Sequence, residues 1–477
     1  MHTLLDGVRG ERLAIAALVV LCLASRLVTT IYYVEDPDSL HFALSMIEFD
    51  VARLQPHFPG YVVFVGLARG LAAMTGSFAI AFSLVGALAT VLLVLGLLAL
   101  VRWPLASRRG ALVALAVVGN GMLWLYANRY MPDLLGAALL VWSLHDLSSD
   151  DPRSRVRGGL LTALLAGTRL SYLPFLLPAV VHAVVARTGR LPLAASFVTG
   201  VLLWAVPLVA LTGWEEIVAI AANQTTGHFD EFGGTIRTEP DVGLRLSRMA
   251  EGVWTDGLGG WVPGRSPLTM LTAVAATVGL ALAAPRARRA LGSRRGRLVL
   301  LGALAYLLWI FLYQNVIHHT RHLLPFVPLM ALVIAAGWER VASRGRAGSA
   351  IAAAAIGAVA VLGGVLAWKH RQPTAIAQVS RALMTEREGL TIVSTGLVND
   401  MLAGTGVRAR FLAVGRDSVA DSLRLTPSSG RLFSVGDYRS NVRMPVARLT
   451  RFHHNPHVNR IWPLIELYEY RAAEARR

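Results

Sequence analysis

The sequence predicts an all-α polytopic membrane protein that carries a small C-terminal α/β domain. Hydrophobic residues make up 55% of its 477 residues, charged residues only 16%, and the mean hydropathy is +0.53. Soluble domains carry about 25% charged residues. Apolar stretches recur up to Trp368, whereas polar and apolar residues are mixed thereafter. We therefore divide the chain into a transmembrane domain, 1–368, and a small soluble domain, 369–477.

About eleven or twelve apolar segments are candidates for membrane crossings. They are Leu13–Tyr33, Tyr61–Met74, Phe78–Val101, Ala111–Tyr126, Leu134–Leu147, Gly158–Gly167, Leu173–Ala186, Leu191–Thr212, Leu268–Ala284, Leu298–Val316, Leu323–Gly337 and Ile351–Trp368. Tyr61–Met74 is short and contains Arg69. Either this segment is a re-entrant or surface helix that does not cross the membrane, or the arginines at 102–109 lie on the external side. The number of crossings between residues 59 and 101 therefore stays open.

Arginine placement orients the chain. The net charge is +17, and Lys369 is the only lysine, a bias that suggests a GC-rich bacterial genome. Arginine clusters between the apolar segments are assigned to the cytoplasm. The loops 34–58 and 213–267 and the C-terminal domain are then external. The sequence thus predicts a multi-pass protein of a bacterial inner (cytoplasmic) membrane with a site facing the periplasm. No nucleic acid is expected, because the positive charge is not gathered on one soluble face.

The C-terminal domain combines short β-type runs with helical segments. The runs are Leu390–Ser394, Arg410–Val414, Leu432–Val435 and Ile465–Tyr470. No glycine-rich phosphate fingerprint is found at a strand–helix turn. The single cysteine, Cys22, lies in the first apolar segment, which excludes a disulfide within the chain.

Two carboxylates, Asp36 and Asp38, follow the first apolar segment directly, and Pro37 restricts the backbone between them. A carboxylate near a region of low dielectric has a raised pKa, which suits a general base. The pair also offers hard oxygen ligands for a divalent cation such as Mg²⁺ or Mn²⁺. The alternative is an ordinary solvated acidic loop.

The next external residues of interest are His57 and Tyr61, in a His-x-Pro-Gly-Tyr turn that leads back to an apolar segment. A helix-entry turn explains the proline and glycine but not the two aromatic side chains. A histidine beside an acidic loop can bind phosphate or tune a base. We therefore include both residues in the candidate site.

Three further external turns carry polar residues. In the first, Arg129 precedes Asp133, which can also be an ordinary helix-start residue. Arg169 and Tyr172 interrupt an apolar stretch, where an arginine is a functional candidate unless it snorkels to the surface. A third turn holds His319 and Arg321, which suit contact with a polyanion or interface anchoring rather than the i, i+4 zinc spacing.

Together these segments resemble the membrane-embedded GT-C glycosyltransferases, which take a sugar from a polyprenyl-phosphate carrier. The resemblance covers roughly Leu13–Gly337. It rests on the Asp-x-Asp at 36–38, the His-x-Pro-Gly-Tyr at 57–61, Arg-Tyr-Met-Pro-Asp at 129–133, Gly-Thr-Arg-Leu-Ser-Tyr-Leu-Pro at 167–174 and Arg-His-Leu-Leu-Pro-Phe-Val-Pro at 321–328. The first two motifs are most similar to the branch that includes O-mannosyltransferases.

The resemblance implies an inverting transfer from a polyprenyl-phosphate-linked sugar to an acceptor hydroxyl at the external membrane face. Asp36 would be the catalytic base, with Asp38 the next candidate, and Arg169 and Arg321 would hold the carrier phosphate. The acceptor is left open among a glycan, a lipid and a protein. The alternatives are a lipid-linked glycan ligase or polymerase and a transporter or flippase of lipid-linked sugars, although a transporter predicts internal repeats that the sequence lacks.

Overall fold

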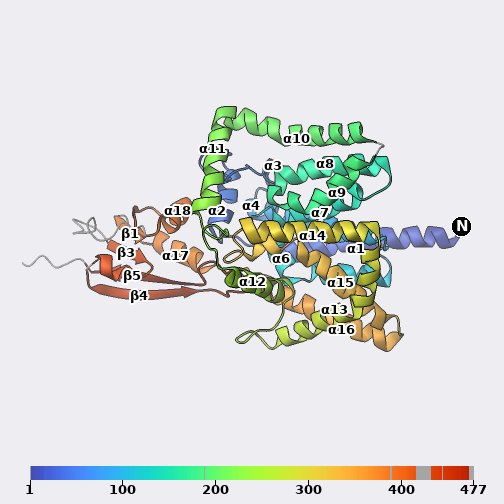
Figure 1. Cartoon of the computed structure of the whole chain (residues 1–477). Coiled ribbons are helices and arrows are strands. Elements are labelled where there is room, and N and C mark those ends of the chain that lie inside the picture. The colour runs from blue at the N-terminus through green and yellow to red at the C-terminus, as the bar shows by residue number, and fades with distance from the viewer. Residues whose placement is uncertain (1, 187–188, 387–388, 415–430, 443, 472–477) are drawn as a thin grey trace, which may run out of the picture.

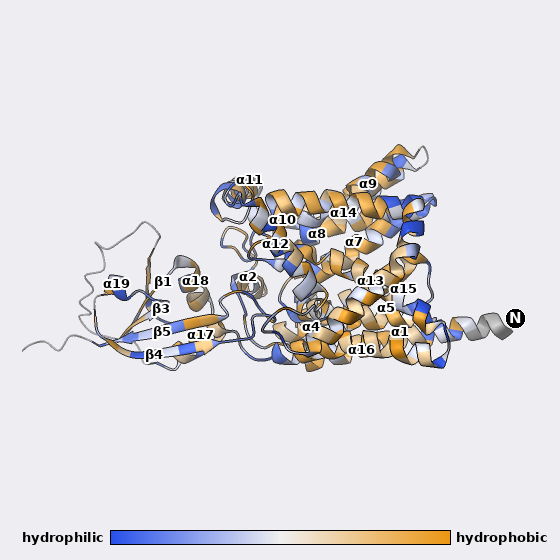
Figure 2. Ribbon diagram, turned by 60° about the horizontal axis from the view of Figure 1, so that its bottom comes forward, coloured by the Kyte–Doolittle hydropathy of each residue, from blue (hydrophilic) through white to orange (hydrophobic). Residues whose placement is uncertain are grey.

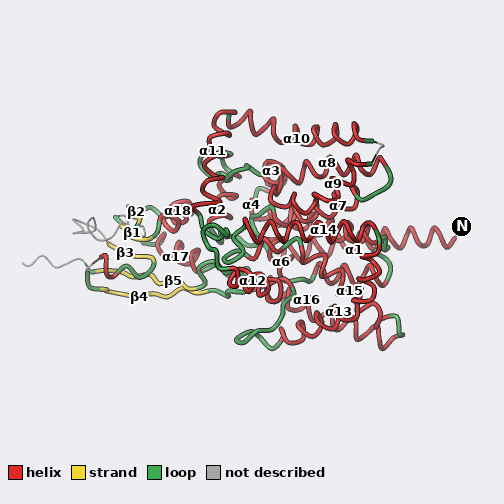
Figure 3. The backbone as a smooth tube through the Cα atoms, viewed as in Figure 1, coloured by secondary structure: helices red, strands yellow, loops and turns green. Residues whose placement is uncertain are grey.

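The computed structural model describes residues 2–186, 189–386, 389–414, 431–442 and 444–471. A large helical bundle is joined to a small sheet domain, which projects from the end of the bundle opposite the N-terminus (Figure 1). The strands gather beyond the ends of the long helices (Figure 3). Hydrophobic residues dominate the bundle along its length (Figure 2). The predicted all-α membrane domain with a C-terminal α/β domain is therefore confirmed.

The helices of the bundle correspond to the predicted apolar segments. They are α1 (His2–Val28), α3 (Val62–Thr75), α4 (Phe78–Val101), α5 (Arg108–Val118), α6 (Gly121–Asn128), α7 (Asp133–Leu147), α8 (Pro152–Arg169), α9 (Leu173–Val185), α10 (Arg190–Thr212), α13 (Leu268–Gly292), α14 (Arg294–Tyr313), α15 (Phe326–Ala342) and α16 (Arg346–Lys369). Short 3-10 segments, η1 (Leu170–Tyr172) and η4 (Thr320–Leu323), precede α9 and α15.

Fewer helices than the predicted eleven or twelve are long and apolar enough to span a membrane. Within the described residues six qualify, or seven if α5 and α6, which meet at a 60° bend, form one broken span. Two predicted segments fall within one helical run, Pro152–Val185. Others, such as α7 with 15 residues, form helices too short to qualify on their own. The short α3 remains outside the six, as its length and Arg69 suggest.

The second predicted external loop, 213–267, is largely helical. It contains α11 (Trp214–Thr226) and α12 (Val242–Glu251), each continued by a π-helical stretch, η2 (Gly227–Glu231) and η3 (Gly252–Gly257). The Asp241 side chain caps α12 by accepting the Leu244 N–H at 2.8 Å. This correction matters because η3 lies beside the candidate site.

Helix α4 is central to the bundle. Its residues are buried along most of its length, and it packs against α1, α3, α6 and α7. A Cβ added at Gly86 would lie 1.7 Å from the backbone oxygen of Ala127, so α4 and α6 approach too closely for any side chain. This contact fixes the position of the turn that follows α6.

The C-terminal domain holds a five-stranded mixed sheet of order β2-β1-β3-β5-β4. The strands are β1 (Leu390–Ser394), β2 (Arg410–Ala413), β3 (Arg431–Val435), β4 (Val446–His453) and β5 (Leu464–Tyr470), and the helices are α17 (Ala375–Met384), α18 (Gly396–Gly404) and α19 (Arg439–Val442). Four strands match the predicted runs. The fifth, β4, is an edge strand with mostly exposed side chains, so its sequence lacks the apolar pattern of a buried strand.

Two features join the domains. Helix α2 (Pro37–Ser45) contributes Leu40 to the core of the C-terminal domain and Phe42 to the core of the bundle. In the opposite direction, the connection between β4 and β5 returns to the bundle, where Val458 packs against Leu125, Leu362 and Leu366. We call residues 454–463 the β4–β5 loop. The two cores are therefore held together from both sides.

We expect the substitution Gly86→Ala to destabilise the bundle by about 1–3 kcal/mol or more, because the added methyl group collides with backbone rather than a movable side chain. Gly357→Ala is the matched control, since a Cβ there meets no atom within 4 Å. Chemical unfolding of both variants in detergent measures the difference. Equal stability of the two variants would contradict the packing of α4 against α6.

Candidate active site

Asp36 and Asp38 lie at the start of α2 but face different partners. Asp36 is the N-cap: its Oδ1 accepts the Ser39 N–H at 2.8 Å, and Pro37 occupies the first helical position. Its Oδ2 accepts a hydrogen bond from Nδ2 of Asn459, 3.3 Å away in the β4–β5 loop. The Asp38 carboxylate instead pairs with Arg321 in η4. The two carboxylates are therefore separate in function.

Glu35 holds this segment in place. It has no exposed surface, and its two oxygens pair with Arg129 at 2.9 Å and His370 at 2.7 Å. Burial would raise the pKa of Glu35, but Arg129 and His370 outweigh it and lower the pKa to about 2. Glu35 is therefore an ionised structural carboxylate.

The pKa of Asp36 moves in the opposite direction. Burial, followed by the neighbouring charges of Glu35 and Asp38, raises the pKa of Asp36 to about 6. Although burial acts on Asp38 too, Arg321 lowers its pKa below the usual value. A carboxylate that titrates near neutral pH is suited to accept a proton, so Asp36 has the properties of a general base.

The predicted residues His57, Tyr61, Asp133, Arg169 and Tyr172 form one polar cluster beneath α2. Arg169 pairs with Asp133 at 3.0 Å and contacts the Tyr61 hydroxyl at 3.4 Å, while the Tyr172 hydroxyl is 3.5 Å from Asp133. Nε2 of His57 is 3.0 Å from the Tyr61 hydroxyl. Burial lowers the pKa of His57 to about 3, so this imidazole is neutral.

The groups that could hold a metal ion differ from the predicted pair. Ligand atoms of Asp38, His41 and His57 lie within 4.8 Å of one another, and Asp36 does not belong to this group. The Nδ1 atoms of both histidines are buried without a hydrogen-bond partner among the described residues. Two imidazoles and one carboxylate suit Zn²⁺ or a similar transition metal better than Mg²⁺.

A pocket beside Asp36 brings several predicted residues together with others from distant parts of the chain. Its polar lining consists of Asp36, Arg129, Thr255, Asp256, Arg265, His318, His319, Thr320, Arg321, His457, Asn459 and Arg460. Of the predicted residues, Asp36, Arg129, His319 and Arg321 line it. Arg169 is not among the lining residues, because Asp133 and Tyr61 hold it within the cluster beneath α2.

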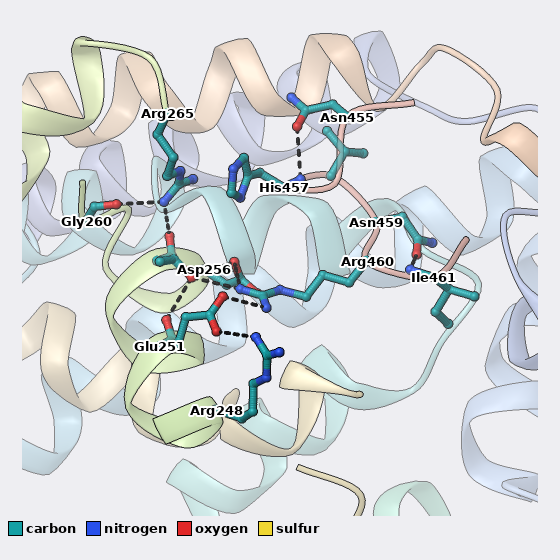
Figure 4. Close-up of polar contacts among 12 residues, drawn as sticks. Arg248, Glu251, Asp256, Gly260, Arg265, Asn455, His457, Asn459, Arg460 and Ile461 are labelled. Carbon is teal, nitrogen blue, oxygen red and sulfur yellow. Dashed lines mark hydrogen bonds and ion pairs between the residues drawn. The ribbon is translucent and has the colours of Figure 1, made fainter. Parts of the chain in front are cut away.

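The far wall of the pocket comes from η3, the segment before α13, and the β4–β5 loop (Figure 4). Arg460 pairs with Asp256 at 2.8 Å and with Glu251 at 3.0 Å. Arg265 is nine-tenths buried and donates to the backbone oxygens of Thr255 and Gly260 at 2.7 and 2.8 Å. Among the described residues no carboxylate lies within 4.0 Å of Arg265, so no direct ion pair neutralises it, although the charge of Asp256 acts on it from farther away.

Sequence reasoning missed Arg265, Asn459 and Arg460. Arg265 stands in Gly264-Arg265-Ser266-Pro267, directly before an apolar segment on the side assigned to the exterior, and this position is a signal comparable to that of Arg169. Asn459 and Arg460 lie in a domain without any recognised motif. Nothing in their local sequence indicates that they reach the first loop.

The chain has the fold of a multi-pass membrane protein whose structure is known. Two crystal structures of ArnT from Cupriavidus metallidurans are similar to the chain. The structure bound to undecaprenyl phosphate matches with a TM-score of 0.54 over 97% of this chain and 98% of ArnT, at 13% sequence identity. The apo structure matches with a TM-score of 0.53 over 96% and 98%, also at 13% identity. No protein-family model and no curated protein matches the sequence.

We expect Asp133→Leu to cost about 3–5 kcal/mol of stability, because it leaves the buried Arg169 guanidinium without its counter-ion. The double variant Asp133→Leu, Arg169→Met should recover most of this loss, since neither charge then remains buried. Unfolding of the wild type, both single variants and the double variant in detergent gives the coupling energy. Additive losses would mean that the pair does not form.

Proposed function

We propose that the protein is a glycosyltransferase that moves a sugar from a polyprenyl-phosphate carrier to an acceptor hydroxyl at the external face of a bacterial cytoplasmic membrane. The observation that carries the proposal is the pocket in which Asp36, with its raised pKa, faces several arginines. The fold shared with ArnT, which was crystallised with undecaprenyl phosphate, supports the choice of donor. The arginine distribution between the helices supports the external placement.

In the proposed reaction Asp36 takes the proton from the acceptor hydroxyl as that oxygen attacks the anomeric carbon of the donor. The new glycosidic bond forms while the bond from the anomeric carbon to the phosphate oxygen breaks. The electron pair leaves with the polyprenyl phosphate, whose growing negative charge is stabilised by arginines. A single displacement of this kind inverts the anomeric configuration.

Among the arginines, we assign the phosphate contact to Arg265 and Arg321. Arg265 has no carboxylate partner within 4.0 Å among the described residues, and a buried guanidinium is costly without a counter-anion. Arg321 lines the same pocket from η4, where Asp38 holds it. A guanidinium fork matches two phosphate oxygens. Arg169, to which the resemblance gave this role, we assign to supporting Tyr61 and the polar cluster beneath α2.

The predicted loss on converting Asp36 to asparagine is about 10²–10⁴-fold in turnover, the usual contribution of a general base. Single-turnover transfer from a polyprenyl-phosphate sugar by purified protein in lipid measures it. Glu48→Gln is the control, because Glu48 is an exposed carboxylate of the same loop that pairs only with Arg53 among the described residues. Near wild-type turnover of Asp36→Asn would refute the assigned base.

The transfer rate of the wild type should fall as the pH drops below about 6. Asp36 is a base only when ionised, and its pKa is raised to about 6, so protonation removes the base over this interval. The measurement is kcat/KM for the donor between pH 4.5 and pH 8. A rate that stays constant down to pH 4.5 would exclude a base with this pKa.

For Arg265→Ala we expect KM for the lipid-phosphate donor to rise roughly tenfold to a hundredfold, because a hydrogen bond to a charged group contributes about 1.5–3 kcal/mol. Arg53→Ala is the matched control, since Arg53 is an exposed arginine paired with Glu48 and Asp50 on the first loop. Donor titration in lipid nanodiscs separates KM from kcat. An unchanged KM would remove Arg265 from the donor site.

A further inference from the structure

The carboxylate of Asp36 depends on a residue of the C-terminal domain for one of its two hydrogen bonds. Its Oδ1 caps α2 by accepting the Ser39 N–H. Its Oδ2 accepts a hydrogen bond from the side chain of Asn459. The two residues are 423 positions apart in the sequence. Asn459 is itself buried, with 3% of its surface exposed. The contact therefore lies inside the structure rather than at a surface where water could replace it.

The orientation of the Asn459 amide is fixed by its other contact. Its Oδ1 accepts the Ile461 N–H at 2.8 Å, and only the amide oxygen can do so. This leaves Nδ2, the donor, directed at the carboxylate of Asp36 and at that of Glu35, whose pKa the Asn459 side chain helps to lower. Figure 4 shows the side chain held against Ile461 in this way.

The β4–β5 loop that carries Asn459 is anchored to the bundle on both sides of this residue. On one side, the Val458 oxygen accepts a hydrogen bond from Arg129, and its side chain packs against Leu125 and Leu366. On the other side, Arg460 binds η3 through Asp256, with Glu251 as a second partner (Figure 4). The docking is polar on one side and apolar on the other, which defines the position of the loop.

We propose that Asn459 is a positioning residue for Asp36, and that the C-terminal domain thereby completes the catalytic pocket. This inference rests on the function proposed for Asp36. An N–H donated to a carboxylate stabilises the ionised form and restrains its rotation. Without Asn459 the base would hold its proton up to a higher pH and would point less consistently at the acceptor hydroxyl.

Other charges also face Asp36, and the proposal requires that they stay in place when Asn459 is changed. Glu35 and Asp38 from its own segment favour the protonated form, and Arg129 favours the ionised form. The remaining charged or titratable groups of the pocket wall are Tyr126, Asp256, Arg265, His318, His319, Arg321, His457 and Arg460. Substituting a neutral amide changes none of these charges, so a changed titration reports the lost hydrogen bond.

The test compares Asn459→Ala with Asn455→Ala, a matched control in the same loop. Asn455 accepts the His457 N–H at 2.9 Å (Figure 4), and it is not among the hydrogen-bond partners of Asp36 in the described part of the chain. The first measurement is carbodiimide labelling of Asp36 as a function of pH, followed by peptide mass spectrometry, which needs no substrate. We expect the labelling midpoint of Asn459→Ala to lie about one pH unit above that of the wild type and of Asn455→Ala.

The second measurement is the pH profile of sugar transfer. For Asn459→Ala the acidic limb of kcat/KM should move to higher pH, with kcat at pH 6 about fivefold lower and the donor KM nearly unchanged. Identical labelling midpoints for the two alanine variants would overturn the inference even where transfer falls. Absence of transfer in the wild type would overturn the proposed function instead, while labelling would still decide the role of Asn459.

A second variant guards against misfolding. Arg460→Ala removes the ion pairs that hold the loop on η3 and also one positive charge of the pocket wall, and both losses should move the labelling midpoint in the same direction as Asn459→Ala. Melting in detergent establishes that each variant is folded before it is labelled. A folded Arg460→Ala with the wild-type midpoint would show that Asp36 does not depend on the docked loop.

Discussion

The buried carboxylate of Glu35 is the constraint on which the arrangement of the site depends. A charge without exposed surface is tolerated only when polar partners compensate it, and here Arg129 pairs with one oxygen of Glu35 while His370 lies 2.7 Å from the other. Those two residues come from the turn after α6 and from the end of α16. Because Arg129 also donates to the oxygen of Val458, one network connects the first loop, two parts of the bundle and the C-terminal domain.

The network also separates the roles of three carboxylates that are neighbours in sequence. Glu35 pairs with Arg129, and its pKa is lowered to about 2, whereas Asp36 is buried beside two negative charges, and its pKa is raised to about 6. Asp38 is held by Arg321. Opposite pKa shifts in adjacent carboxylates are the arrangement that an acid–base site requires. Among the described residues Asp36 has no ion-pair partner, and its oxygens accept hydrogen bonds from Ser39 and Asn459 instead.

The two domains of the chain act as one structural unit at the pocket. Helix α2 places Leu40 in the core of the C-terminal domain and Phe42 in the core of the bundle, while the β4–β5 loop packs in the opposite direction against α6 and α16. A rigid scaffold on both sides suits a site that must keep the Asp36 carboxylate and the arginines of the pocket at a fixed separation. The sheet domain therefore contributes part of the pocket wall.

Local patterns determined much of this protein. Apolar segments predicted the helices, short β-type runs predicted four strands, and the position of Asp36 and Asp38 directly after the first apolar segment predicted a base candidate. Tertiary structure alone decided that Arg169 is paired with Asp133, that Arg265 faces the pocket without a nearby carboxylate partner among the described residues, and that Asn459 reaches Asp36. Helix and strand patterns depend on residues a few positions apart, so they can be recognised in the sequence. A contact across 423 positions depends on how whole helices pack, and no short pattern encodes it.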